Sequence, residues 1–285
     1  MRTALVFGGS GQIGEALLAR LPAAGWRVCA VSRTPRPSTD EVQWRVGDFQ
    51  GIAGVPAQVD AIVSAGPLDG FAQWYVRGDV AAPRVLAFGS TSLETKQASG
   101  DAYERDLAAR LQAGERGVFD TAGARGAAAT LLRPTLVYGA GRDQTLARIA
   151  AMARRSGFFV LPRGATGLRQ PVHVDDLAAA VLAALDAPAT HGRAYALPGG
   201  ETLPYREMVA RTLAALRSPA RLLEVPAPLF GAALRAARLA GRMRGLTDAA
   251  VARMREDLVF DAGPAARDFG YAPRAFLPDA RALGV

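Results

Sequence analysis

Apolar runs and amphipathic stretches alternate along the first two-thirds of the chain. Short strand-like runs, most of them largely apolar, predict strands at residues 3–7, 27–31, 42–46, 59–64, 85–88 and 128–132. Apolar residues recur at helical spacing between them, in segments 12–24, 68–80 and 101–116. Strands that are apolar on both faces and that alternate with helices are typical of a parallel sheet covered by two helical layers. The pattern therefore predicts an α/β fold.

The pattern changes after about residue 134. Predicted helices then alternate with short strands such as 158–161 and 194–197, and these helices cover residues 144–156, 174–185, 204–216, 228–240 and 248–256. No linker is rich enough in Gly, Ser or Pro to separate two independent domains. We predict a sheet domain at residues 1–135 that takes its last strands from 136–200. A smaller, mostly C-terminal α/β substrate lobe, residues 136–285, is interleaved with it.

A glycine-rich turn follows the first predicted strand and opens a helix. Gly8, Gly9, Gly11 and Gly14 fit the spacings G-x-G-x-x-G and G-x-x-G-x-x-G. Glycines let backbone N–H groups approach a pyrophosphate, and the helix N-terminus offers donors and a positive dipole end. Strand–turn–helix context is the condition that makes such a pattern informative. We predict a dinucleotide-binding, Rossmann-type doubly wound sheet whose turn contacts come from Gly8, Gly9, Ser10, Gly11, Gln12, Ile13 and Gly14.

The end of the second predicted strand bears on the choice of dinucleotide. A carboxylate there recognises the ribose 2′-OH of NAD, whereas the 2′-phosphate of NADP needs a cation. This strand ends at Ser32 and Arg33, with Arg36 close by and no acid before Asp40. We therefore predict that Ser32 and Arg33 bind NADP, with NAD as the alternative; an Arg33 side chain that merely lies in solvent is the competing interpretation.

Composition limits the possible classes of protein. The net charge is +8, carried almost wholly by arginine, and no run of 18 apolar residues occurs. A lone cysteine, Cys29, cannot form an internal disulfide, which favours a cytoplasmic protein. We find no nucleic-acid module and no zinc-ligand spacing, so we expect no nucleic-acid partner, no membrane span and no metal. The small-molecule substrate is the expected partner, and a homodimer stays open.

One basic stretch allows two interpretations. Residues 229–244 carry Arg235, Arg238, Arg242 and Arg244 among Leu, Phe, Ala and Met. A helix of this kind can lie on a membrane surface. We prefer a helix that packs on the protein and exposes a solvated basic face.

Several segments, in order, resemble the extended short-chain dehydrogenase/reductase superfamily, of the NAD-dependent epimerase/dehydratase type. Besides the glycine turn, the resembling segments are residues 46–49, 60–66, 86–92, 132–139, 170–177 and 269–273. The resemblance implies adenosine contacts from Asp48, Phe49, Ala65 and Gly66, and nicotinamide-side contacts from Pro134 and Thr135. It also implies a catalytic Ser90 or Thr91, a Tyr103 that acts as acid/base, and an Arg169 on a substrate phosphate, for which a surface-loop arginine is the alternative.

The segment around Tyr103 departs from the pattern of that family. The family places a lysine four residues after the tyrosine, where its charge lowers the phenol pKa, but position 107 is leucine. Such a departure resembles the atypical branch of the superfamily, which includes a respiratory complex I accessory subunit. Two functions follow: an NADP-dependent oxidoreductase or epimerase acting on a small or nucleotide-linked substrate, or a non-catalytic dinucleotide-binding sensor or assembly protein. Of the two, we favour the enzyme.

Overall fold

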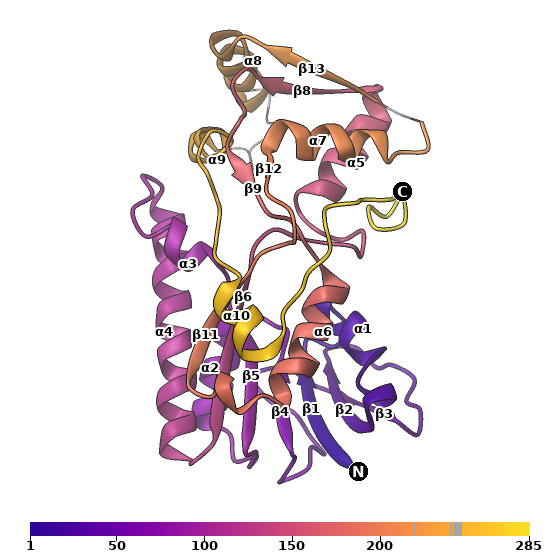
Figure 1. The fold of residues 1–285 in the computed structure, drawn as a ribbon, viewed down its shortest axis with the longest axis vertical. Helices are drawn as coiled ribbons and strands as arrows, with labels where there is room; N and C mark the ends of the chain where they lie inside the picture. The colour runs from indigo at the N-terminus through magenta and orange to yellow at the C-terminus, as the bar shows by residue number, and fades with distance from the viewer. Residues whose placement is uncertain (219, 240, 242–246) are drawn as a thin grey trace. The chain divides into compact units, whose positions relative to one another are not determined.

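The computed structural model describes residues 1–218, 220–239, 241 and 247–285, and it divides into two compact units (Figure 1). Unit 1 comprises Met1–Thr135, Val174–Pro198 and Asp261–Pro273. Unit 2 comprises Leu136–His173, Gly199–Phe260 and Arg274–Val285. Each unit is therefore assembled from three separate stretches of the chain.

Unit 1 is built on one parallel sheet. Its seven strands are β1 (Arg2–Phe7), β2 (Trp26–Ser32), β3 (Val42–Val46), β4 (Ala61–Ser64), β5 (Arg84–Phe88), β6 (Ala128–Pro134) and β11 (Arg193–Leu197). They lie in the order β11-β6-β5-β4-β1-β2-β3, and every neighbouring pair is parallel. The chain winds outward in one direction from β1 and in the other from β4, which confirms the predicted doubly wound fold.

Helices cover this sheet. They are α1 (Gln12–Leu18), α2 (Leu68–Arg77), α3 (Ser92–Thr95), α4 (Ala102–Ala124), α6 (Val174–Leu185) and α10 (Gly263–Phe269). The predicted helix 12–24 ends at Leu18 and resumes as a 3₁₀ turn at Pro22–Ala24, because Pro22 has no N–H to continue the α-helical pattern. The predicted helix 101–116 continues to Ala124, since Val118 and Ala122 extend its buried stripe.

Unit 2 has helices and three two-stranded sheets around a second core. Its helices are α5 (Leu146–Ser156), α7 (Tyr205–Ala214), α8 (Ala227–Leu239) and α9 (Asp248–Arg253). Its strands are β7 (Val137–Tyr138), β8 (Phe158–Pro162), β9 (Leu168–Arg169), β10 (Val172–His173), β12 (Leu203–Pro204) and β13 (Arg221–Val225). β10 pairs with β7 and β13 with β8 in parallel, whereas β12 and β9 are antiparallel. Residue 240, predicted to end a helix, lies outside the described residues.

Candidate functional site

The glycine turn lies at the point where the strand order of the sheet reverses. Gly8 follows β1 and has φ +70°, and a Cβ built on it would lie 2.6 Å from the carbonyl carbon of Ala65, which follows the neighbouring strand β4. A Cβ on Gly14 would lie 2.0 Å from the Gly8 oxygen. Gly8 therefore lets the turn approach β4, and Gly14 lets helix α1 approach the turn. A crevice at such a reversal is where open α/β sheets bind ligands.

The turn also exposes groups that suit an anionic ligand. Gly11 N–H donates to the Gly8 oxygen over 2.8 Å, and α1 then begins without a side-chain cap. The first N–H groups of a helix have no partner within it. Among the described residues, Gln12 Oε1 and Ser64 Oγ are buried without a hydrogen-bond partner. These two atoms come from the start of α1 and the end of β4, the strand that pairs with β1 before the turn.

The predicted adenosine residues lie on the β4 side of the turn. The Phe49 ring stacks on Phe7 with centroids 5.1 Å apart. Its Cζ would be 2.8 Å from a Cβ on Gly66, so the ring lies directly against that glycine. Asp48 is exposed and accepts the Gln50 N–H over 2.8 Å. The structure thus brings Phe49 and Gly66 together and leaves the Asp48 carboxylate at the surface.

An aromatic ring connects the end of β2 with the glycine turn. Ser32 is buried, and its Oγ accepts the Thr34 N–H over 3.2 Å, while Arg33 is exposed. The Arg36 guanidinium lies 5.2 Å from the centroid of the Trp44 ring. Trp44 Cη2 in turn would be 3.2 Å from a Cβ on Gly9. Trp44 therefore lies between the Arg36 guanidinium and the glycine turn. The sequence showed only that Arg36 follows the end of β2 by a few residues.

Ser90 and Thr91 follow β5 and differ in how their hydroxyls are used. Thr91 is buried, and its Oγ1 donates to the Pro134 carbonyl over 3.2 Å. Ser90 Oγ accepts the Ser92 N–H over 3.1 Å, so the proton of its hydroxyl is left for another acceptor. Thr135 N–H donates to the Leu197 oxygen over 3.3 Å, which ties the segment after β6 to β11.

Helix α4 turns Tyr103 outward. The Tyr103 side chain is 69% exposed, and its N–H is capped by Asp101 over 2.9 Å. The buried face of this turn carries Glu104, whose Oε2 accepts the Ser99 hydroxyl over 2.7 Å. Lys96 Nζ lies 3.7 Å from Glu104 Oε1. The lysine of this loop is thus paired with a buried carboxylate, and the catalytic role of Tyr103 stays a prediction.

A charged pair supports the segment that carries Ser90. Arg133 on β6 binds both carboxylate oxygens of Glu115, over 2.8 and 2.5 Å, and it also reaches Glu94 over 2.9 Å. Hydrogen bonding to Glu115 raises the pKa of the Arg133 guanidinium. Glu115 Oε1 would be 3.0 Å from a Cβ on Gly89, immediately before Ser90. Sequence inspection did not single out this pair, because its members are 18 residues apart in number.

Arg169, in unit 2, donates to the backbone. Its guanidinium binds the carbonyls of Leu168 and Glu256 over 2.7 and 2.8 Å and that of Arg253 at shorter range. The group lies 5.2 Å from the Tyr205 ring centroid, and burial lowers the pKa of the guanidinium. A contact of Arg169 with a substrate phosphate stays a prediction.

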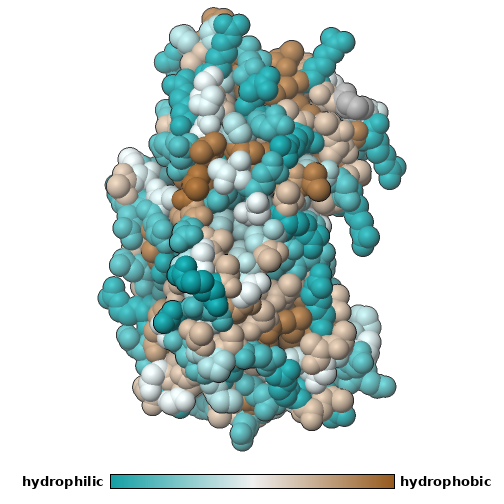
Figure 2. All heavy atoms as spheres, viewed as in Figure 1, coloured by the Kyte–Doolittle hydropathy of each residue, from teal (hydrophilic) through white to brown (hydrophobic). Residues whose placement is uncertain are grey.

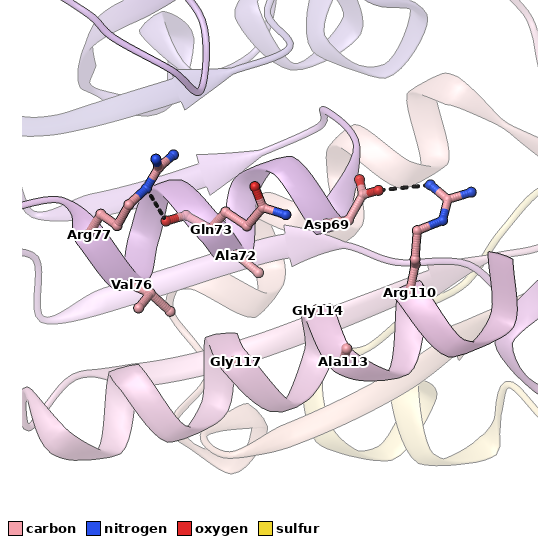
Figure 3. A pocket seen from close by; sticks show the side chains of 9 residues that line it. All are labelled: Asp69, Ala72, Gln73, Val76, Arg77, Arg110, Ala113, Gly114 and Gly117. Atoms are coloured by element: carbon pink, nitrogen blue, oxygen red, sulfur yellow. Dashed lines mark hydrogen bonds and ion pairs between the residues drawn. The ribbon is translucent and has the colours of Figure 1, made fainter. Parts of the chain in front are cut away.

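A groove of about 480 Å³ runs between α2 and α4, away from the glycine turn (Figure 3). Ala72 and Val76 of α2 face Ala113 and Gly117 of α4 across it, and the Asp69–Arg110 ion pair of 2.9 Å closes one end. No residue of the turn lines this groove. The groove is therefore separate from the glycine turn.

The described residues contain no helix that is long and apolar enough to cross a membrane. Within the same residues, no group of three or more His, Cys, Asp or Glu side chains is arranged to hold a metal ion.

Comparison with known proteins agrees with this fold. Residues 90–197 match the model of the NAD dependent epimerase/dehydratase family. The 2-alkyl-3-oxoalkanoate reductase of Stenotrophomonas maltophilia is 28% identical, with 96% of each chain covered. NADH dehydrogenase [ubiquinone] 1 alpha subcomplex subunit 9 of Arabidopsis thaliana is 32% identical over 35% of this chain and 25% of its own. The structure of MoeE5 with UDP-glucuronic acid and NAD has a TM-score of 0.71 at 19% identity, over 99% of this chain and 96% of that one.

Proposed function

We propose that unit 1 binds a nicotinamide dinucleotide and that the protein is an NADP-dependent oxidoreductase. The match of residues 90–197 to the NAD dependent epimerase/dehydratase family supports this proposal. The observation that carries the proposal is the glycine turn at the reversal of the strand order, where Gly8 packs directly against Ala65. There, glycines permit close backbone approach, and two buried polar atoms, Gln12 Oε1 and Ser64 Oγ, have no partner among the described residues.

The residues present fit such a ligand. The turn and the first N–H groups of α1 would hold the pyrophosphate, with Ser10, Gln12 and Ile13 around it. Phe49, Ala65 and Gly66 would lie along the adenosine half. Ser32, Arg33 and Arg36 would receive the 2′-phosphate, because two cations and no carboxylate follow β2 before Asp40. This charge balance supports NADP over NAD.

A bound nicotinamide dinucleotide supplies or accepts a hydride. The chain's own part is to orient and polarise the substrate. The Ser90 hydroxyl, whose proton is not used by Ser92, can donate to a substrate oxygen, while Thr91 holds the segment against Pro134. Tyr103 is the proton donor that we propose, although its side chain is 69% exposed and the residue one turn later is Leu107.

The substrate class follows from the relatives only as a proposal. The Stenotrophomonas relative is by its name a reductase of 2-alkyl-3-oxoalkanoates, and MoeE5 was solved with a nucleotide sugar. We propose a carbonyl compound that is either small or nucleotide-linked, with reduction or epimerisation as the reaction, in the cytoplasm. Leu107 and the exposed Tyr103 favour the second candidate, a non-catalytic dinucleotide-binding protein that acts as a sensor or assembly partner.

Fluorescence titration with NADPH and NADH tests cofactor choice. We expect NADPH to bind more tightly than NADH. The double variant Arg33→Ala with Arg36→Ala should lower the affinity for NADPH about tenfold or more and leave the affinity for NADH unchanged. Gly11→Val should abolish the binding of both cofactors, because the valine side chain would fill the space of the pyrophosphate. A Cβ there lies 3.1 Å from the Gly8 oxygen, a crowded contact, so thermal unfolding of the variant is measured alongside. Equal affinities in the parent protein would contradict the NADP assignment.

Turnover of a 3-oxo ester with NADPH then separates the two candidate functions. Tyr103→Phe should remove activity and leave NADPH affinity intact. Absence of turnover in a parent protein that binds NADPH would favour the sensor or assembly role.

A further inference from the structure

The positive charge of the chain is concentrated in unit 2. Unit 2 contains 18 arginines against 8 Asp and Glu residues, whereas unit 1 contains 16 basic residues against 18 acidic ones. Unit 1 is therefore slightly acidic, and unit 2 carries more than the whole net charge of +8. A surplus of this size creates a potential that attracts anions over the surface.

Helix α8 of unit 2 turns apolar side chains toward solvent. Leu229 is 64% exposed and Leu239 is 91% exposed, while Leu234 is the one buried residue of the helix. Positions 229, 232, 233, 236 and 239 fall on one helical face, are all Leu or Ala, and are all exposed. Arg235 is exposed at the edge of this stripe. Of the basic face that we expected on residues 229–244, Arg242 and Arg244 lie outside the described residues, Arg235 is exposed, and Arg238 binds Asp248 over 2.9 Å. The rest of the solvated face of α8 is largely apolar.

The β8–β13 sheet, whose strand β8 contacts α8, also exposes apolar side chains. Strand alternation turns Phe159 and Leu222 toward the core of unit 2. Their neighbours point the other way, where Phe158 is 44% and Leu223 is 42% exposed. Arg221 is paired in register with Phe158 and is exposed. In Figure 2, brown side chains lie among teal ones over the elements labelled α8, β8 and β13.

We propose that this surface binds an anionic lipid membrane. We call it the α8 surface, and it consists of Phe158, Arg221, Leu223, Leu229, Arg235 and Leu239. Leucine and phenylalanine side chains can enter the boundary between headgroups and acyl chains, while arginines at the edge contact lipid phosphates. The protein lies on the bilayer without crossing it, in keeping with the lack of a spanning helix among the described residues.

Charge and chemistry favour this occupant over two others. A second copy of the chain would bring two strongly positive units together, which is repulsive. A nucleic acid would satisfy the arginines but offers no apolar phase for Leu229 and Leu239. A lipid surface matches both the charge and the apolar stripe.

Co-sedimentation with large unilamellar vesicles tests the proposal. We expect the full chain to bind vesicles of 70% phosphatidylcholine and 30% phosphatidylglycerol, to bind pure phosphatidylcholine much less, and to release as salt rises. Leu229→Asp with Leu239→Asp should weaken partitioning at least about tenfold, and Arg235→Glu about fivefold. These side chains are exposed, so thermal unfolding and NADPH affinity should be unchanged.

Matched variants in unit 1 provide the controls. Val76→Asp replaces a residue that is 53% exposed, and Arg116→Glu reverses an exposed charge; neither should alter vesicle binding. Equal binding to neutral and anionic vesicles, or binding indifferent to the leucine variants, would overturn the proposal. Capture by heparin without vesicle binding would identify a polyanion site instead. A dimer in size-exclusion chromatography that Leu229→Asp dissociates would identify a second copy as the occupant.

Discussion

Unit 1 and unit 2 place their charged residues differently. In unit 1, Arg133 is held by the buried Glu115, and Lys96 by the buried Glu104. The buried Arg84 donates to the Thr130 and Thr190 hydroxyls over 2.8 and 2.6 Å, and burial lowers the pKa of this guanidinium to about 10. In unit 2, Arg206 meets Glu224 at an exposed position.

The difference shows how each unit uses arginine. In unit 1 the Arg133–Glu115 pair lies against Gly89, next to Ser90 and Thr91, so a buried charge pair fixes this segment. Unit 2 has more than twice as many arginines as carboxylates, so it carries a large excess of positive charge. A segment fixed by a buried pair suits ligand positioning, and an excess of positive charge suits association with an anionic partner.

The largest expected effect concerns two close glycine contacts, one from each unit. Gly14→Ala would bring a methyl group within 2.0 Å of the Gly8 oxygen, and Gly199→Ala would bring one within 1.8 Å of the Pro171 oxygen. We expect each to lower the free energy of unfolding by at least about 3 kcal/mol. Urea unfolding followed by tryptophan fluorescence reports on unit 1, because Trp26, Trp44 and Trp74 all lie there.

The two variants should differ in ligand binding. Gly14→Ala should abolish NADPH binding, whereas Gly199→Ala should leave it intact if unit 1 alone binds the dinucleotide. Loss of NADPH binding in both variants would contradict the hypothesis that unit 1 alone binds it. Gly123→Ala is the control, since a Cβ there meets nothing within 4 Å, and it should stabilise α4 by up to about 1 kcal/mol.

A smaller effect is expected from the ion pairs. Glu115→Ala leaves Arg133 without its bidentate partner at a site that is mostly buried, and we expect a loss of about 3 kcal/mol in unfolding free energy. Glu224→Ala in unit 2 removes a partner from an Arg206 that is 50% exposed, which should cost less than about 1 kcal/mol. Urea unfolding monitored by circular dichroism compares them. Equal losses would contradict the contrast between buried and exposed pairs.

The smallest expected effect is on pH dependence. Hydrogen bonds from Arg211 lower the pKa of the Glu201 carboxyl in unit 2 below 4.5. A carboxyl whose pKa is lower in the folded than in the unfolded state stabilises the fold above pH 4.5, and this contribution is lost as the pH falls through the lowered pKa. Glu201→Gln should therefore flatten the acid limb of a Tm–pH profile below pH 4.5. An unchanged acid limb would show that the Glu201–Arg211 pair adds nothing to unit 2.

Much of unit 1 could be predicted from the chain alone. Each of the six predicted strands of the first two-thirds of the chain corresponds to a strand of the sheet. For β4 and β5 the reason is burial on both faces, which leaves a nearly continuous apolar run. The glycine spacing likewise marked the turn at Gly8–Gly14. Strand β13 escaped prediction, since its sequence from Arg221 to Val225 mixes exposed and half-buried positions without an apolar run.

The sequence by itself determined the parallel sheet, the position of the glycine turn and the absence of a carboxylate after β2, because these depend on local periodicity and neighbouring residues. Only the tertiary structure decided that Arg36 lies over the Trp44 ring and that Glu115 pairs with Arg133. The same holds for the outward-facing Tyr103 and for the exposed leucines of α8. Each of these depends on which residues from distant parts of the chain are brought together, and burial and pairing arise only from that packing.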